Sequence, residues 1–216
     1  MAGCLILATA TPAFAANGFY LGVEGGATFL NDADFVGTGP STGVTFTTNY
    51  DTGYLAGGFF GYQDQFMRFE AEMAYRHNDW EDVTDATVAG IGTVPSFESA
   101  GIGVSGETNV LNVMANVYLD MHNSSPITPY IMAGVGFAAI EIYDITFSTA
   151  GSTLEVADEH DTVLAWQLGG GLSFAFNDMV SMNIDYRYFA TTDPEFTDVD
   201  FEYESHNVVA SVLFHI

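Results

Sequence analysis

Apolar and polar residues alternate with a period of two along most of the chain. In residues 164–176 the even positions are almost all large and apolar, whereas the odd positions are small or polar. This period places the two kinds of side chain on opposite faces of a β-strand. Residues 67–76, 111–121 and 180–188 repeat the pattern. Each of the four stretches has about the length that a tilted strand needs to cross a bilayer.

Four weaker segments complete a set of eight strands, at residues 19–29, 53–62, 130–137 and 208–216. The segment at 53–62 is ambiguous, because apolar residues occupy both its odd and its even positions. We expect the even positions to face outward, namely Tyr54, Ala56, Phe60 and Tyr62.

The connections between these segments alternate in length. Those near residues 63–65, 122–127 and 177–178 are short, and those near 31–50, 79–107, 144–161 and 191–204 are long. Eight strands joined in this way form an up-and-down meander with both termini and the three tight turns at one end. In outer-membrane barrels that end is periplasmic, and the long loops are extracellular. We see no second domain and no linker.

Composition indicates which face of the barrel meets lipid. Only 14% of the 216 residues are charged, against about 25% in typical soluble domains. The apolar stripes carry rings such as Trp166, Phe174 and Tyr186, which are together too bulky for the lumen of eight strands. The opposite faces carry small or polar residues. We therefore predict an all-β protein, an eight-stranded antiparallel up-and-down transmembrane β-barrel, rather than a soluble barrel with an apolar cavity.

The N-terminal segment has the features of a signal peptide, which we place at residues 1–15, with the barrel at residues 16–216. A short apolar run precedes Ala13-Phe14-Ala15, a small-x-small cleavage pattern. The usual basic region is missing, so we expect the true start to lie upstream of Met1. Cys4 is the single cysteine, and its removal would leave the barrel with no disulfide and no thiol nucleophile.

Several segments resemble the OmpA-like and opacity-protein superfamily of small outer-membrane β-barrels. They are residues 17–26, 57–62, 129–136 and 206–209, which read NGFYLGVEGG, GGFFGY, PYIMAGVG and HNVV. Ile216 takes the place of the C-terminal Phe that such barrels usually carry. The resemblance covers the whole mature chain. It implies the outer membrane of a Gram-negative bacterium, assembly by the barrel insertion machinery, and adhesion or recognition through surface loops.

Charged residues at inward-facing positions form the first candidate site. We expect a lumen polar cluster of Glu24, Arg68, Glu70, Glu72, Arg76, Asp120, Asp185 and Arg187. Charges in a lumen are costly unless they are paired, so one interpretation is a structural plug bridged by the arginines. The alternative is a narrow, porin-like proton or ion path, because the carboxylates outnumber the arginines by two.

The long loops contain most of the acidic residues and no basic residue. With 28 Asp and Glu, three Arg and no Lys, the formal charge is −25, which excludes nucleic acid as a partner. In an extended segment four carboxylates would share one side, and Ca²⁺ prefers such oxygen ligands: Asp198, Asp200, Glu202 and Glu204. The alternatives are a solvated surface and Ca²⁺ or Mg²⁺ bridges to lipopolysaccharide phosphates among the outer-membrane lipids. We expect no other cofactor.

An enzyme would need a nucleophile beside a base. Ser205 and His206 are adjacent in sequence, and neighbouring strand residues point to opposite faces. We therefore expect no catalytic residues. The predicted function is non-catalytic: envelope structure and surface loops for adhesion or recognition, with a surface ligand that the sequence does not name.

Overall fold

The computed structural model describes residues 17–31, 33–37, 44–88, 92–98, 101–121, 123, 125–149, 152–155, 159–192, 195–196, 199–200 and 203–216. The expected signal segment, residues 1–15, lies outside these residues. No helix in the described part of the chain is long and apolar enough to cross a membrane.

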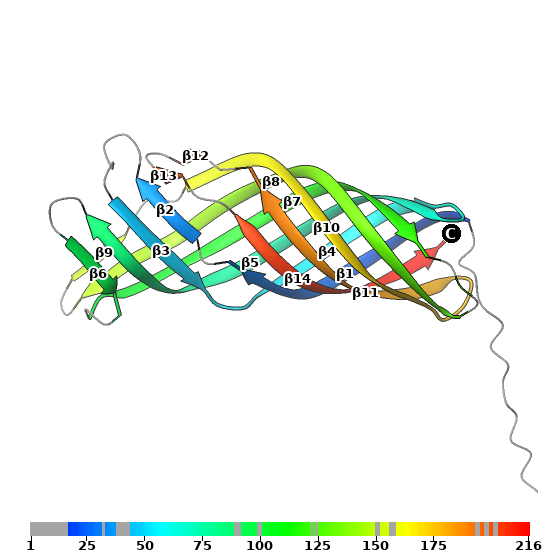
Figure 1. Ribbon diagram of the computed structural model, residues 1–216, viewed down its shortest axis with the longest axis horizontal. Helices are drawn as coiled ribbons and strands as arrows, with labels where there is room; N and C mark the ends of the chain where they lie inside the picture. Colours follow the sequence, from blue (N-terminus) through cyan, green and yellow to red (C-terminus); the bar gives the residue numbers. More distant parts are fainter. Residues whose placement is uncertain are drawn as a thin grey trace, which may run out of the picture.

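Eight long strands form a closed antiparallel barrel, which confirms the predicted fold (Figure 1). Each strand pairs with the next along the chain, and the last pairs with the first, with Leu21 opposite Phe214. The strands are β1 (Gly18–Leu30), β4 (Gly53–Gln63), β5 (Met67–Val88), β7 (Gly103–Asp120), β8 (Ile127–Thr149), β10 (Glu159–Ala175), β11 (Val180–Thr191) and β14 (Glu204–His215).

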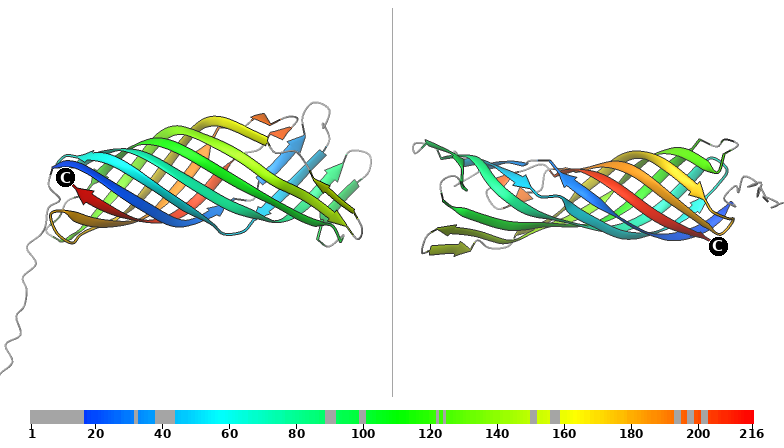
Figure 2. Two further views of the ribbon diagram at one scale, coloured as in Figure 1. Left: turned by 180° about the vertical axis from the view of Figure 1, so that it is seen from behind. Right: turned by 90° about the horizontal axis from the view of Figure 1, so that it is seen from below.

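Within the described residues, six short strands lie at the end of the barrel opposite the C-terminus (Figures 1 and 2). They are β2 (Ala33–Gly37), β3 (Val44–Tyr50), β6 (Gly92–Ser96), β9 (Ser152–Glu155), β12 (Glu195–Phe196) and β13 (Val199–Asp200). β3 pairs with the second half of β5, at residues 80–88, and β2 pairs with β3 on one side and with β13 on the other. The long connections are therefore largely β-structure rather than the plain loops that we expected, because strand pairing continues past the apolar stripes. We call this part the extracellular β-structure.

The outer face of the barrel carries a belt of exposed apolar side chains. Val135 is 63% exposed and Leu168 is 51% exposed, values that a soluble protein would rarely repeat around a whole surface. In the ambiguous strand, β4, the even positions face outward, as we expected. Leu55 and Phe59 are buried, whereas three of the four predicted outward side chains are large and exposed: Tyr54, Phe60 and Tyr62. Lipid is the environment that this belt fits.

Inward-facing glycines make room for the long polar side chains of the interior. A Cβ atom added to Gly134 would lie 2.0 Å from Oδ1 of Asn116. Neighbouring inward positions can therefore hold large side chains, as the narrow lumen of eight strands requires.

Beyond the belt, toward the end opposite the C-terminus, the apolar residues lie on the inner face of the strands and the polar residues on the outer face. Ile140 and Ile142 of β8 are buried, while Glu141 between them lies on the partly exposed outer face. The interior at this level is an apolar cluster that includes Trp80, Val83, Ala86, Val110, Met114, Ala138, Ile140, Ile142, Val163, Ala165, Phe189 and Tyr203. We expected a packed polar interior with loops beyond it, and the apolar cluster lies mostly where the strands continue past the segments that the apolar stripes predicted. Strands that rise out of lipid into water need their apolar face inside.

Candidate functional site: the barrel interior

All eight residues of the expected lumen cluster lie on inward faces. Their exposures range from 0% for Arg76 to 7% for Asp120. They come from β1, β5, β7 and β11, so the barrel walls bring together residues that are far apart in the sequence.

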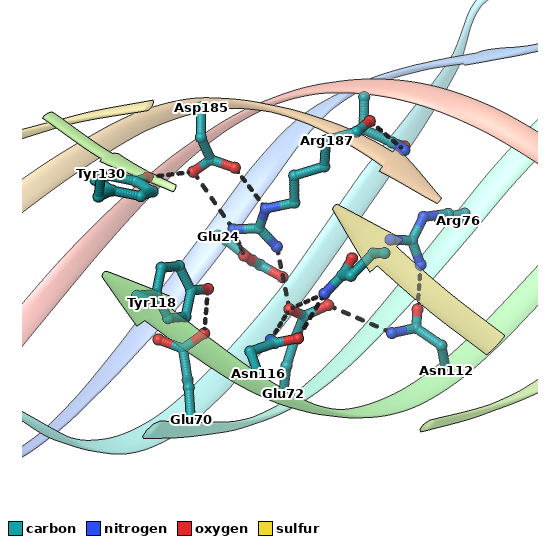
Figure 3. Close-up of polar contacts among 12 residues, drawn as sticks. Glu24, Glu70, Glu72, Arg76, Asn112, Asn116, Tyr118, Tyr130, Asp185 and Arg187 are labelled. Atoms are coloured by element: carbon teal, nitrogen blue, oxygen red, sulfur yellow. Dashed lines mark hydrogen bonds and ion pairs between the residues drawn. The ribbon is translucent and has the colours of Figure 1, made fainter. Parts of the chain in front are cut away.

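Arg187 lies at the centre of this cluster and pairs with three carboxylates (Figure 3). Its Nη2 atom is 3.0 Å from Oε2 of Glu24, and its Nη1 atom is 3.1 Å from Oε2 of Glu72. Its Nε atom donates to Oδ2 of Asp185. Asp185 lies on the same strand as Arg187, whereas Glu24 and Glu72 lie on β1 and β5, so one guanidinium ties β11 to two other strands.

A second ion pair lies closer to the periplasmic end. Nε and Nη2 of Arg68 both bond the carboxylate of Asp120, at 3.0 Å to Oδ2 and 2.9 Å to Oδ1. This two-point geometry is the strongest that an Arg and a carboxylate form. The guanidinium also lies over the rings of Tyr118 and Tyr130, 4.3 and 4.7 Å from their centroids.

Hydroxyl and amide groups donate to the carboxylates of Glu70 and Glu72. Tyr20 and Tyr118 donate to Glu70 at 3.0 and 2.7 Å. Glu72 accepts from three side-chain amides, at 3.3 Å from Asn112, 2.7 Å from Asn116 and 3.1 Å from Gln167. Inward parity placed Asn112, Asn116 and Gln167 on the same faces as the charged residues, but we did not predict them as donors to the cluster.

Arg76 differs from the other two arginines. Its Nη1 atom donates to Oδ1 of Asn112, and its guanidinium lies 4.0 Å from the ring centroid of Phe189. Among the described residues it forms no salt bridge, and its Nε and Nη2 atoms have no hydrogen-bond partner. It marks the border between the charged layer and the apolar cluster, to which Phe189 belongs.

The expected calcium ligands are only partly described. Asp198 and Glu202 lie outside the described residues, and of Asp200 only the backbone is described, in β13. Glu204 accepts a 3.0 Å hydrogen bond from Asn31. The described residues contain no group of three or more His, Cys, Asp or Glu side chains that could hold a metal ion.

Ser205 and His206 face opposite sides of the β14 wall, as strand geometry predicts. Ser205 is fully buried and accepts a hydrogen bond from Asn207. His206 lies on the outer face, with its Nδ1 atom bonded to the Tyr186 hydroxyl. The two side chains therefore cannot act together as nucleophile and base.

The comparisons with known proteins agree with this architecture. A family model described as outer membrane protein beta-barrel domain matches residues 1–214. The outer membrane protein PagN of Salmonella typhimurium is 27% identical over 195 residues, which cover 85% of this chain and 79% of PagN.

Two solved structures share the fold. Neisserial surface protein A is 17% identical with a TM-score of 0.53, and the match covers 92% of this chain and 97% of that one. The outer membrane protease OmpT from Escherichia coli is 4% identical with a TM-score of 0.59, and the match covers 94% and 98%. At these identities the likeness concerns the fold alone.

Proposed function

Because the chain belongs to the outer membrane protein beta-barrel domain family, we propose that it is a non-catalytic surface protein whose barrel carries a recognition surface outside the cell. The extracellular β-structure is that surface, and the barrel anchors it in the outer membrane while contributing to envelope structure. The proposal gives the long connections a role beyond joining strands.

The observation that carries this proposal is the apolar core beneath the extracellular β-structure. β5 has 22 residues and β8 has 23, about twice the length that a strand needs to cross the bilayer. Above the belt these strands enclose their own apolar cluster. Simple turns would need no such core, whereas a shaped surface that holds a partner does.

The charge of this surface favours a cationic partner. All three arginines are buried and five acidic residues are buried with them, so the other 23 acidic residues of the chain are accompanied by no Arg or Lys. On the outer face Asp79 lies opposite Glu107, and Glu141 lies on the next strand. Like charges at paired positions repel, and a positively charged protein or peptide would relieve that repulsion.

Attachment assays test the proposal. We expect a non-adherent bacterium that displays the full chain to attach to a monolayer of cultured cells more than vector-only bacteria do. Added polylysine should compete for attachment by covering the acidic surface, whereas dextran, a neutral polymer, should not. The combined variant Asp79→Asn, Glu107→Gln, Glu141→Gln should attach less, because it lacks the paired charges.

Asp64→Asn is the matched control, because Asp64 is an exposed acid in the short turn at the other end of the barrel. It should leave attachment unchanged. Attachment no higher than that of vector-only bacteria, with the protein shown at the surface by antibody, would contradict the recognition role.

Ion conduction through the lumen, the alternative that the sequence left open, has less support. The Arg187 ion pairs and the apolar cluster above them occupy successive levels of the interior. We keep, as part of the proposal, divalent cation bridges between the acidic residues of the long connections and lipopolysaccharide phosphates. Carboxylates and phosphates are both negatively charged, so such cations are needed between them.

A further inference from the structure

Four aromatic side chains lie together on the outer face of β10, β11 and β14. The ring centroids of Trp166 and Tyr188 are 5.3 Å apart, those of Tyr188 and His206 are 5.4 Å apart, and those of Tyr186 and His206 are 5.9 Å apart. We call this group the His206 patch. These strands are direct neighbours in the barrel (Figure 1), with Tyr188 opposite His206.

The patch lies at the extracellular border of the apolar belt. On β10 the exposed apolar residues Leu164 and Leu168 flank Trp166, and the exposed polar residue Thr162 follows beyond Leu164. The charged group nearest along β14 is Glu204, which faces outward two residues before His206 and is bonded by Asn31. The patch thus meets the level where lipid headgroups begin.

The two borders of the belt differ in chemistry. At the periplasmic border the exposed rings are mostly phenylalanines, which cannot form hydrogen bonds: Phe19, Phe66, Phe69, Phe176 and Phe214. At the extracellular border hydroxyl- and nitrogen-bearing rings predominate, with Tyr54, Tyr75, Trp166 and Tyr186 exposed and Tyr188 half-buried. This difference favours a polar ligand in the outer leaflet over a general lipid anchor, which would act equally at both borders.

The Nε2 atom of His206 can donate to a ligand outside the protein, whereas the other border histidine has both ring nitrogens in contact with protein oxygens. The Nδ1 atom of His206 contacts the Tyr186 hydroxyl, and when that hydroxyl donates, the ring proton lies on Nε2. His77 on the opposite wall uses both nitrogens, with Nδ1 2.7 Å from Oδ1 of Asn109 and Nε2 3.5 Å from Oδ1 of Asp79. Both ring nitrogens of His77 therefore already have partners within the protein.

We propose that the His206 patch binds the phosphorylated sugar headgroup of an outer-leaflet glycolipid. The sugar ring stacks its C–H groups on the faces of Trp166 and Tyr188, which carry negative partial charge. The phosphate accepts a hydrogen bond from Nε2 of His206. Every arginine of the chain is buried, so none can contact the phosphate of the lipid. The N–H of His206 makes that contact instead. The proposal does not depend on the recognition role of the extracellular β-structure.

Lipid titration into nanodiscs tests the proposal. The full chain is placed in phosphatidylcholine nanodiscs with EDTA, which removes cation bridges, and lipopolysaccharide is then titrated. We expect saturable retention on the barrel and a rise in the temperature at which the compact gel band is lost. His206→Phe keeps the ring and removes the donor, and we expect affinity to fall about tenfold, the effect of one charge-assisted hydrogen bond.

Three controls make the test specific. His77→Phe should bind like the unmodified protein, and Trp166→Leu should bind more weakly because stacking is lost. Phosphatidylglycerol, which has phosphate and no sugar, and a galactolipid without phosphate should each bind more weakly than lipopolysaccharide. Each variant is first shown to form the compact, boiling-sensitive band. Equal affinity of His206→Phe and the unmodified protein, or of phosphatidylglycerol and lipopolysaccharide, would overturn the proposal.

Discussion

The three arginines of this barrel experience different surroundings although all are buried. Arg187 contacts three carboxylates and Arg68 contacts one at two points, whereas Arg76 contacts an amide and a phenylalanine ring. A buried carboxylate that loses its partner is costly, but removing a charge that had no ionic partner is not. The same substitution should therefore have different effects at different positions.

We expect Arg187→Met to lower the free energy of unfolding by about 3–5 kcal/mol, because Glu24, Glu72 and Asp185 would be left without their shared cation. Arg76→Met is the matched control and should cost about 1 kcal/mol or less, since it removes one hydrogen bond to Asn112. Urea titrations in lipid vesicles measure both. Equal losses for the two variants would contradict the central role of Arg187.

Glycine positions matter in the interior for a steric reason. Gly134→Ala would force its Cβ against Asn116, whereas Gly25 on the outer face has Leu55 O as its nearest neighbour, 3.6 Å away. We expect a clear drop in the unfolding midpoint for Gly134→Ala and little change for Gly25→Ala in the same titration. Similar midpoints for both would show that the lumen can adjust around the added methyl group.

At the scale of the strand, the period-two pattern predicts most of the barrel. In β8 the odd positions Ile131, Val135 and Phe137 face lipid, as the alternation indicates. The same strand also contains the signal that we missed. Ala138, Ile140 and Ile142 are apolar and occupy even positions, which places them inside an extension that is surrounded by water. We interpreted this stretch as a loop, because its apolar residues move from odd to even positions. Such a change resembles the end of a strand.

Arginine substitutions along β8 locate the border between lipid and water. We expect Val135→Arg to cost about 2–4 kcal/mol in refolding experiments, because Val135 lies within the exposed apolar belt. Glu141→Arg should cost about 0–1 kcal/mol, the value for a position near the interface. A large cost at Glu141 would mean that the extracellular β-structure is itself in lipid.

The acidic segment before β14 remains a sequence prediction, since Asp198 and Glu202 lie outside the described residues. If its carboxylates bind calcium, the ion should raise the melting temperature of the folded barrel, and the variant lacking Asp198, Asp200 and Glu202 should lose that rise. Differential scanning calorimetry with calcium and with EDTA measures the effect. Melting that is insensitive to calcium would indicate a solvated acidic surface.

For the molecule as a whole, buried side chains of different chemistry fill the interior at two levels. The lower level is the charged layer around Arg187, and the upper level is the apolar cluster with Trp80 and Phe189. The sequence predicted the charged layer from inward parity, but not that its excess carboxylates are held by tyrosine and amide donors. Side-chain pairing across a barrel depends on strand register, which the hydrophobic pattern alone leaves open.

Two closures in series predict how conductance should respond to mutation. In planar bilayers the unmodified protein should produce no conductance steps, and neither should Arg187→Ala, because the apolar cluster still blocks the upper level. Trp80→Ala with Phe189→Ala should also stay closed, because the ion pairs below remain. Combining all three should open a cation-selective path, since Glu24, Glu70 and Glu72 would then face water. Conductance from the unmodified protein or from Arg187→Ala alone would instead favour a narrow ion channel, provided that each variant still forms the compact, boiling-sensitive band.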